Sequence, residues 1–188
     1  RDGSGEHLWY ALSPAFKDDD SAVINSDTRG TLAVYAADGS TLLTPVGYSA
    51  VAVVFAPGAP LTGQERDTVA SACATTGATM ERRLCAVNYL DAGGTVTTRN
   101  NATLGGPFIA GMPAATFNDR LLFITTRELM PVIEQRVARE LITVLNGFYA
   151  IYGFYPWADF NTFAYGDPSY EANANVGLNK GKLPLDLS

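Results

Sequence analysis

The amino-acid sequence predicts an α+β domain in which an antiparallel or mixed sheet packs against one long amphipathic helix, with long irregular loops. The length of 188 residues suits one domain, two short apolar runs have the composition of buried strands, and one long segment repeats apolar residues every three or four positions. We therefore interpret residues 1–188 as a single domain. It divides into an irregular N-terminal segment (1–30), a strand-rich part (31–126), a long helix (127–152) and an aromatic-rich irregular C-terminus (153–188).

The charge balance argues against several classes of partner. The chain carries 13 Lys and Arg against 19 Asp and Glu, a net charge of −6. Binding to a nucleic acid depends on clustered cations, so nucleic acid is a poor candidate. Charged residues are 17% of the chain, below the ~25% of typical soluble domains. Much of the surface is therefore uncharged, which favours contact with another molecule. No apolar run approaches the ~20 residues that cross a bilayer, so we expect neither a membrane span nor a signal peptide in this chain.

Three segments have the pattern of strands. Residues 31–35 and 41–44 flank Asp38-Gly39, a dipeptide that supplies the positive φ of a tight hairpin. Residues 48–55 form a nearly continuous apolar and β-branched run, which predicts a central strand covered on both faces. Residues 121–126 are a second buried-strand candidate and lead directly into the long helix.

Two further segments are harder to assign. Residues 64–73 are compatible with two or three helical turns capped by Thr62. Residues 91–107 are rich in Gly, Thr and Asn and predict a long surface loop. This loop contains Asn101-Ala-Thr, a glycosylation pattern short enough to be frequent by chance.

The long helix is the strongest local prediction. Thr126 is a suitable N-cap, Glu128 falls in the first turn, and Pro131 lies early enough to be tolerated. Apolar residues follow at helical spacing on one side, and Gly153 is the expected terminator. We expect this stripe to pack lengthwise on the sheet, so that Leu141→Asp would be strongly destabilising. The stripe consists of Leu129, Val132, Ile133, Val137, Leu141, Leu145, Phe148, Tyr149 and Tyr152.

Aromatic residues crowd the region after this helix. They are interleaved with Pro, Gly, Asp and Asn, so they lie on turns and irregular chain. The rings either seal the end of the helix–sheet core or form a platform for a sugar, a peptide or a neighbouring subunit. Sealing is the more ordinary role. The interaction candidates are Tyr152, Phe154, Tyr155, Trp157 and Phe160.

The cysteine and histidine inventory limits the chemistry. Cys73, Cys85 and His7 are too few and too widely spaced for a structural zinc site. No nucleophile motif accompanies His7, so we interpret it as a solvated or partly packed side chain and assign no catalytic residue. Cys73 and Cys85 enclose a small, polar, Thr-rich segment of the kind found in exported domains, which favours a disulfide over two buried thiols.

One passage resembles a known family. Residues 136–159 are similar to the end of the long helix in type IV pilins and type II secretion pseudopilins, where an amphipathic helix runs out through a Gly-Xaa-Tyr-Pro segment. Phrases at 31–44, 49–58, 118–126 and 179–184 also look like large pilin-like proteins. The N-terminal apolar helix of the family is absent, so the chain resembles the soluble part alone. The matching residues are Leu145, Tyr149, Tyr152, Gly153, Tyr155 and Pro156, with Tyr152 where the family often has Asn.

The resemblance implies a location and a partner. A pilin-like protein is exported to the periplasm, the cell surface or an extracellular filament, where the setting for Cys73 and Cys85 is oxidising, and it assembles with other pilin-like subunits. Some family members bind calcium, and we assign no cofactor here. The oxygen-rich groups Asp18-Asp19-Asp20 and Asp159, Asn161, Asp167 are more simply interpreted as solvated turns.

Three functions follow in order of preference. The first is a non-catalytic structural or interaction subunit of a bacterial type IV pilus-like or type II secretion-like filament. The alternative is a secreted carbohydrate-binding module that uses the C-terminal aromatic cluster. The third is a carboxylate-based hydrolase, although no spacing of Asp and Glu singles out a pair.

Overall fold

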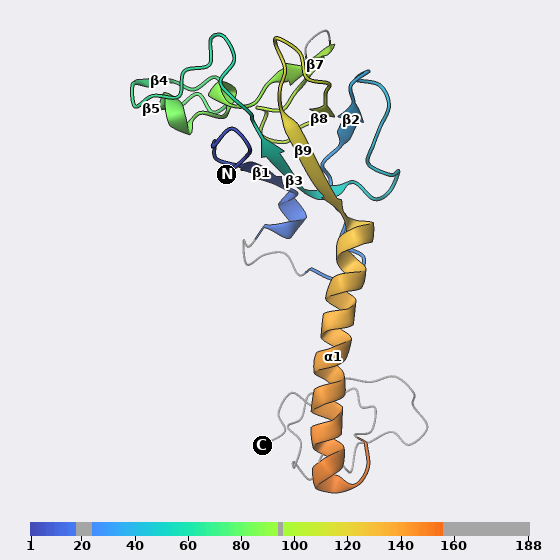
Figure 1. Ribbon diagram of the computed structural model, residues 1–188. Helices are drawn as coiled ribbons and strands as arrows, with labels where there is room; N and C mark the ends of the chain where they lie inside the picture. Colours follow the sequence, from blue (N-terminus) through green and yellow to red (C-terminus); the bar gives the residue numbers. More distant parts are fainter. Residues whose placement is uncertain (18–23, 94–95, 156–188) are drawn as a thin grey trace. The chain divides into compact units, whose positions relative to one another are not determined.

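The computed structural model describes residues 1–17, 24–93 and 96–155 (Figure 1). By their internal contacts the residues form two compact units, Arg1–Pro131 and Val132–Ser188, and each is described by itself. The described residues form several short strands, paired mostly antiparallel, and one long helix. The predicted α+β class is therefore confirmed.

A three-stranded sheet lies at the centre of the first unit. Its strands are β1 (Trp9–Leu12), β3 (Ala50–Ala56) and β9 (Arg120–Thr125), in the order β1-β3-β9 (Figure 1). Both neighbouring pairs are antiparallel. The two apolar runs that predict buried strands thus become β3 and β9, with β3 in the middle. The third strand, β1, lies in the N-terminal segment predicted to be irregular, within residues 8–12, the one part of it whose sequence suits a short strand or a turn of helix.

The sheet buries one face only. Val53 and Phe55 of β3 are 0% and 1% exposed, whereas Val54 between them points to the other face and is half-buried. Phe55 meets Phe108 edge to face, with ring centroids 5.0 Å apart. The prediction that both faces of β3 are covered is wrong within the described residues. A continuous apolar run does not say how many layers the chain supplies to cover it.

The remaining strands form three two-stranded pairs. β2 (Val34–Ala36) is parallel to β8 (Phe108–Ala110), which gives the fold its mixed pairing. The predicted hairpin at Asp38-Gly39 is confirmed, because Leu43 N–H donates to Val34 O and Gly39 has φ +67°. The other pairs and the short 3-10 helices are β4 (Ala70–Ala72) with β5 (Thr79–Glu81), β6 (Ala92–Gly93) with β7 (Val96–Asn100), η1 (Pro14–Phe16), η2 (Arg82–Leu84) and η3 (Ala86–Asn88).

Two segments differ from their predictions. Residues 64–73 form no helix; they contain β4, which pairs antiparallel with β5. Residues 91–107 are not simply a surface loop, because they contain β6 and β7 and the buried residues Asp91, Asn101 and Ala102. In both places contacts with distant residues outweigh local propensity, which is a weak guide in polar segments.

Helix α1 (Thr126–Tyr152) begins immediately after β9. The N-cap is Thr125, one residue before the predicted one: its Oγ1 accepts from Glu128 N–H, while Glu128 Oε2 accepts from Thr125 N–H at 2.8 Å. Thr126 instead accepts a hydrogen bond from Gly30 N–H at 2.9 Å. The predicted terminator is confirmed, since Gly153 has φ +76° and donates its N–H to Tyr149 O at 2.8 Å.

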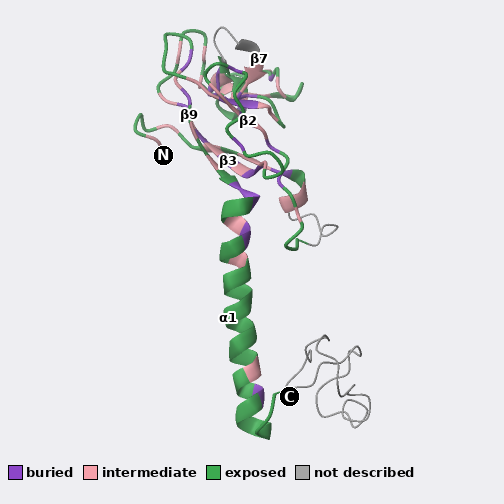
Figure 2. Cartoon of the chain, turned by 90° about the vertical axis from the view of Figure 1, so that its right-hand side faces the viewer, coloured by how far each residue is buried: buried purple, intermediate pink, exposed green. Residues whose placement is uncertain are grey.

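The apolar stripe of α1 is largely exposed. Val132, Val137 and Leu141 are 65%, 51% and 37% exposed, and Figure 2 shows exposed residues along most of the helix. The expected strong destabilisation by Leu141→Asp therefore loses its basis, because the described residues do not bury this side chain. An amphipathic pattern identifies a face made for apolar contact and leaves open which chain supplies the contact.

Candidate functional site

The predicted interaction residues that the structure describes gather at the end of α1. Tyr152, Phe154 and Tyr155 are 40%, 42% and 55% exposed. Their rings are held by neighbours one turn earlier on the helix: Phe148 lies 4.8 Å from Tyr152 and 5.8 Å from Phe154, centroid to centroid. Tyr149 lies 5.0 Å from Tyr155. The reversal at Gly153 is what brings residues 154–155 back beside the last helical turn.

This aromatic cluster combines a buried and an accessible layer. Phe148 is fully buried, whereas the rings around it keep roughly half of their surface in solvent. Packed rings with exposed faces and polar hydroxyls suit either a second protein surface or a sugar. The other two predicted interaction residues, Trp157 and Phe160, lie outside the described residues, as do the oxygen-rich groups at 18–20 and 159–167.

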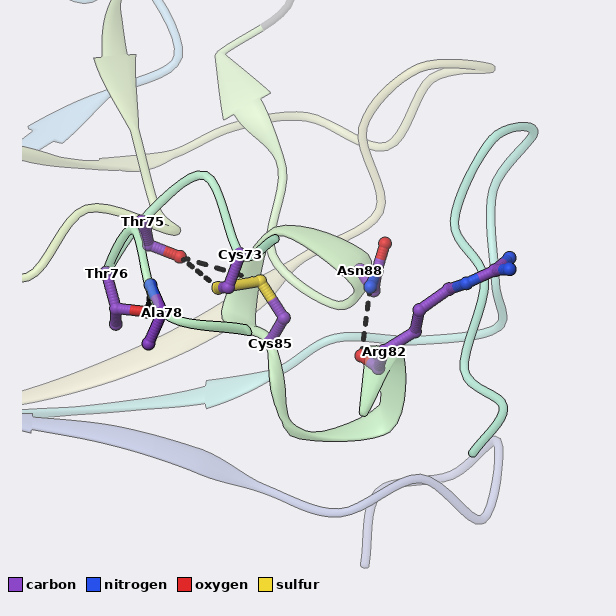
Figure 3. The surroundings of a disulfide bond; sticks show 7 residues. All are labelled: Cys73, Thr75, Thr76, Ala78, Arg82, Cys85 and Asn88. Atoms are coloured by element: carbon purple, nitrogen blue, oxygen red, sulfur yellow. Dashed lines mark hydrogen bonds between the residues drawn. A yellow bond between two sulfur atoms is a disulfide. The ribbon is translucent and has the colours of Figure 1, made fainter. Parts of the chain in front are cut away.

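A disulfide joins Cys73 and Cys85, as the sequence favoured (Figure 3). Both cysteines are 2% exposed, and the bond closes residues 73–85, which contain β5 and its connection to β4. Cys73 O accepts from the N–H groups of Thr76 and Gly77, which tightens the turn. Beyond the bridge, Asn88 Nδ2 donates to Arg82 O at 2.9 Å and fixes η2 against η3. The bridge thus stabilises a polar excursion that has little core of its own.

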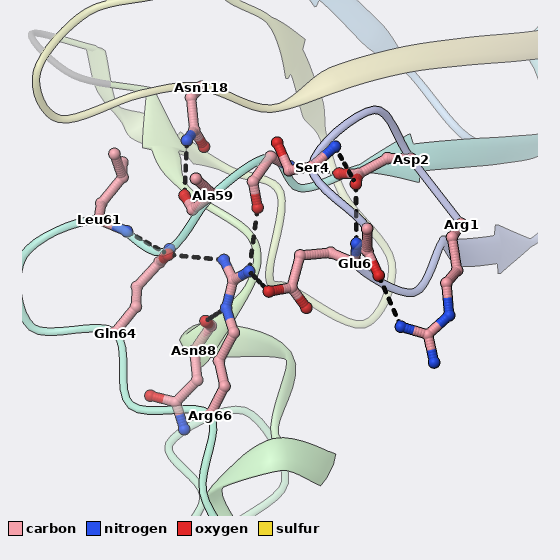
Figure 4. Close-up of polar contacts among 12 residues, drawn as sticks. Arg1, Asp2, Ser4, Glu6, Ala59, Leu61, Gln64, Arg66, Asn88 and Asn118 are labelled. Atoms are coloured by element: carbon pink, nitrogen blue, oxygen red, sulfur yellow. Dashed lines mark hydrogen bonds and ion pairs between the residues drawn. The ribbon is translucent and has the colours of Figure 1, made fainter.

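Arg66 connects several segments of the first unit (Figure 4). Its guanidinium donates to Asn88 O at 2.8 Å, to Gly58 O at 2.9 Å and to Gln64 Oε1 at 2.9 Å, and it pairs with Glu6 Oε1 at 3.0 Å. The same group lies 4.3 Å from the Tyr89 ring centroid. Its side chain is only 7% exposed, so this charge is buried and fully paired.

A second buried network joins two aspartates that are 28 residues apart. Asp91 N–H donates to Asp119 Oδ2 at 2.8 Å, and Asp119 N–H donates back to Asp91 Oδ2 at 3.3 Å. Asn101 Nδ2 adds a bond of 2.9 Å to Asp119 Oδ2, and its Oδ1 accepts from Ile109 N–H. Asp119 Oδ1 is buried without a partner among the described residues.

Burial dominates the titration of this network. Removal from water raises the pKa of Asp119 to about 7, against the lowering effect of its hydrogen bonds to Asp91 and Asn101. Burial also raises the pKa of Asp91, in spite of the bonds it accepts from Asn118, Asp119 and Gln64. Asp91 and Asp119 are only 5% and 2% exposed, so their carboxylates serve to crosslink loops. A hydrolase needs two carboxylates that a substrate can reach, and this pair does not provide them.

Strand β1 carries an exposed apolar surface that the sequence did not single out. Tyr10 is 76% exposed, and Leu8 and Leu84 nearby are 50% and 58% exposed. Two hollows adjoin this strand and share Trp9 and Tyr10: one of about 500 Å³ reaches Leu104 and Phe108, and one of about 600 Å³ reaches His7 and Leu84. His7 itself is exposed, in agreement with its interpretation as a solvated side chain.

Sequence reasoning missed Arg66, the Asp91–Asp119 pair and Asn101. Only Asn101 had a signal of burial in the sequence: it lies in a stretch predicted to be a surface loop, but the apolar runs at 108–110 and 121–124 follow it. Its amide is 1% exposed and bonded to backbone at 3.1 Å (Ile109 O), so it is no glycosylation acceptor in this fold. The bond of Arg66 to Asn88 spans 22 positions and that of Asp91 to Asp119 spans 28, and neither leaves a periodic trace in the sequence.

Comparison with protein-family models, curated proteins and solved structures finds no match to this chain. In the part of the chain that the structure describes, no helix combines the length and the apolar character needed to cross a bilayer. The described ranges also hold no cluster of three or more His, Cys, Asp or Glu arranged for a metal ion.

Proposed function

We propose that the chain is a structural subunit of a bacterial type IV pilus-like or type II secretion-like filament, exported and non-catalytic. The observation that carries this proposal is the exposed apolar stripe of α1, which ends in the aromatic cluster at Phe148–Tyr155. This is the segment whose sequence resembles the pilins. A helix with so much uncovered apolar surface is suited to contact with neighbouring subunits.

Two further features support an exported, assembling protein. The Cys73–Cys85 disulfide is of the kind that persists in the periplasm or outside the cell. The low content of charged residues, 17%, leaves extensive uncharged surface for contacts with other pilin-like subunits. The contacts we propose are hydrophobic, which suits a filament that must be dense and persistent.

The experiment is to produce the full gene product with a small tag in its own bacterium and to shear off the surface filaments. Immunoblotting should find the tag in the sheared fraction, and the signal should disappear when the prepilin peptidase gene is deleted. A tag that stays in the culture supernatant as free protein, unaffected by the peptidase, would contradict the proposal.

The second candidate is a carbohydrate-binding module, which the exposed rings of Tyr152 and Tyr155 favour. A glycan array separates it from the first. Binding that is lost in Tyr155→Ala and retained in Tyr48→Ala, whose ring is 37% exposed elsewhere, would support the module. We expect no glycan to bind above background.

A further inference from the structure

We propose that the central sheet continues from one copy of the chain to the next, with the free edge of β1 pairing with the free edge of β9 of a neighbouring copy. This inference rests on the proposed function, because it names the contact by which filament subunits would join. It uses only the first unit of the chain. The argument depends on three properties of the two edges: free backbone groups, common direction and matched side chains.

Both edges present unused backbone groups. Ser13 N–H donates to Val51 O at 2.7 Å, in register with the β1–β3 pair. Backbone direction alternates along a strand, so Ala11 also faces β3 while Tyr10 and Leu12 face outward. Beyond this ladder the backbone of Tyr10 and Leu12 makes no hydrogen bond to any described residue.

The same alternation applies to β9. Val53 and Phe55 face β1, so Val54 faces β9 and its partner Leu122 faces β3. Leu121 and Phe123 therefore direct their N–H and C=O groups away from the sheet, and neither makes another backbone hydrogen bond among the described residues. The N–H of Thr125, next in this alternation, is taken by Glu128 Oε2, which confirms the outward direction.

The two edges run in the same direction. β1 and β9 are each antiparallel to β3, so they are parallel to one another. A neighbouring copy related by translation can place its β1 beside β9 in a parallel ladder. With Tyr10 in register with Leu122, Tyr10 N–H donates to Leu121 O, and Phe123 N–H donates to Tyr10 O. Such a contact joins two different surfaces, so each copy keeps one free edge for the next copy. Repeating it produces an open filament, where a contact between identical surfaces would stop at a dimer.

The side chains on the two edges match. Tyr10, Val54 and Leu122 form one row across the uncovered face of the sheet. The end members of this row are 76% and 67% exposed, while Val54 between them is half-buried. In the extended sheet Leu122 of one copy lies beside Tyr10 of the next, and Ile124 lies beside Leu12. An open edge with exposed apolar neighbours is a surface that soluble proteins ordinarily protect.

Cysteine pairing tests the contact in the full chain. Tyr10→Cys with Leu122→Cys should give a ladder of disulfide-linked oligomers on mild oxidation, formed at least about tenfold faster than random collision allows. The control is Val46→Cys with Leu122→Cys, since Val46 is 90% exposed and lies elsewhere. Equal rates in the two pairs would overturn the proposal. A dimer from Tyr10→Cys alone would also overturn it, because that result means β1 pairs with itself.

A backbone variant gives an independent test. Tyr10→Pro removes an outward N–H and should weaken concentration-dependent association in sedimentation velocity by at least about tenfold without unfolding the chain. Ala11→Pro, which removes an inward N–H, should instead destabilise the sheet. If Tyr10→Pro fails to fold, Leu122→Lys places a charge on the opposite edge at an exposed site and serves the same purpose. Association as strong in Leu122→Lys as in the wild type contradicts the pairing.

The outcomes separate this inference from the proposed function. If the chain enters sheared filaments but the cysteine pair gives no disulfide-linked oligomers, the filament assignment stands and the sheet pairing is wrong. If disulfide-linked oligomers form but the chain never enters filaments, the sheet pairing stands and the filament assignment is wrong.

Discussion

The two units of the chain use apolar residues in opposite ways. In Arg1–Pro131, large side chains such as Phe55, Phe108 and Val53 are at most 1% exposed and form a packed core. Along the part of α1 that belongs to the second unit, Val137 and Ile142 are 51% and 56% exposed. Apart from the exposed edges of its sheet, the first unit uses its large apolar residues to hold the fold together, and those of the helix are available for contact. Average composition conceals this difference.

The largest expected effect is in the sheet core. Phe55→Ala should lower the free energy of unfolding by about 3–5 kcal/mol, through lost transfer energy and the cavity left against Phe108. Phe154→Ala, a ring that is 42% exposed, should cost less than about 1 kcal/mol. Urea unfolding followed by circular dichroism measures both. Similar losses for the two variants would erase the distinction between core and contact surface.

The disulfide ranks next. Replacing Cys73 and Cys85 together with Ala should destabilise the first unit by about 3 kcal/mol, because the unfolded chain regains the entropy of an open loop of 13 residues. The helical signal of the folded protein should not change. Wild-type protein unfolded in the presence of a reductant is the matched control and should show the same loss. An unchanged urea midpoint would mean that the bridge is dispensable.

The buried aspartate pair predicts a pH dependence. The pKa of Asp119 is raised to about 7 in the folded state, whereas an aspartate in the unfolded chain has a pKa near 4. Between about pH 4 and pH 7 the folded state therefore binds more protons than the unfolded state. Its contribution to stability is therefore full below pH ~4 and is lost as the pH rises to about 7, with a slope of at most ~1.4 kcal/mol per pH unit.

Asp119→Asn should flatten this decline. The neighbouring Asp91, whose pKa burial also raises, should leave a smaller residual slope, with Arg66 the cation that opposes both shifts. Thermal melts between pH 4.5 and pH 7.5 measure the difference between variant and parent. A difference that stays constant over this range would show that Asp119 does not titrate there.

A smaller loss of stability is expected at the junction of β9 and α1. Thr125→Ala removes the N-cap and its reciprocal bond with Glu128, and should cost about 1 kcal/mol. Thr143→Ala removes a hydroxyl that bonds within the helix, to Arg139 O, and should be close to neutral. Urea midpoints compare the two variants, and an equal response would mean that Thr125 does not act as a cap.

Local patterns predicted the parts of the fold that depend on neighbouring residues. The apolar runs at 48–55 and 121–126 and the helical repeat after Thr126 each carry their own signal, and each element is present. Residues 64–73 were ambiguous because a polar segment with a few small apolar residues fits a helix or a strand equally well. Their outcome is decided by the disulfide and by Arg66, whose partners lie elsewhere in the sequence.

The candidate site was predicted only in part, because some of its residues are neighbours in the sequence and others are brought together by the fold. Tyr152, Phe154 and Tyr155 stood out because aromatic residues are dense there, and the described rings do gather at the helix end. The sheet edges did not stand out. Tyr10 and Leu122 are 112 residues apart, and only the strand order places them at opposite ends of one row.

The measurement that tests the account most directly joins stability and assembly in one variant. Val137→Asp places a charge in the exposed apolar stripe of α1, and Gln135→Asp places the same charge on an exposed position beside it. Both should change the free energy of unfolding by less than about 0.5 kcal/mol. In sheared filaments Val137→Asp should be lost and Gln135→Asp retained. Normal incorporation of Val137→Asp, or a loss of stability comparable with Phe55→Ala, would contradict the account.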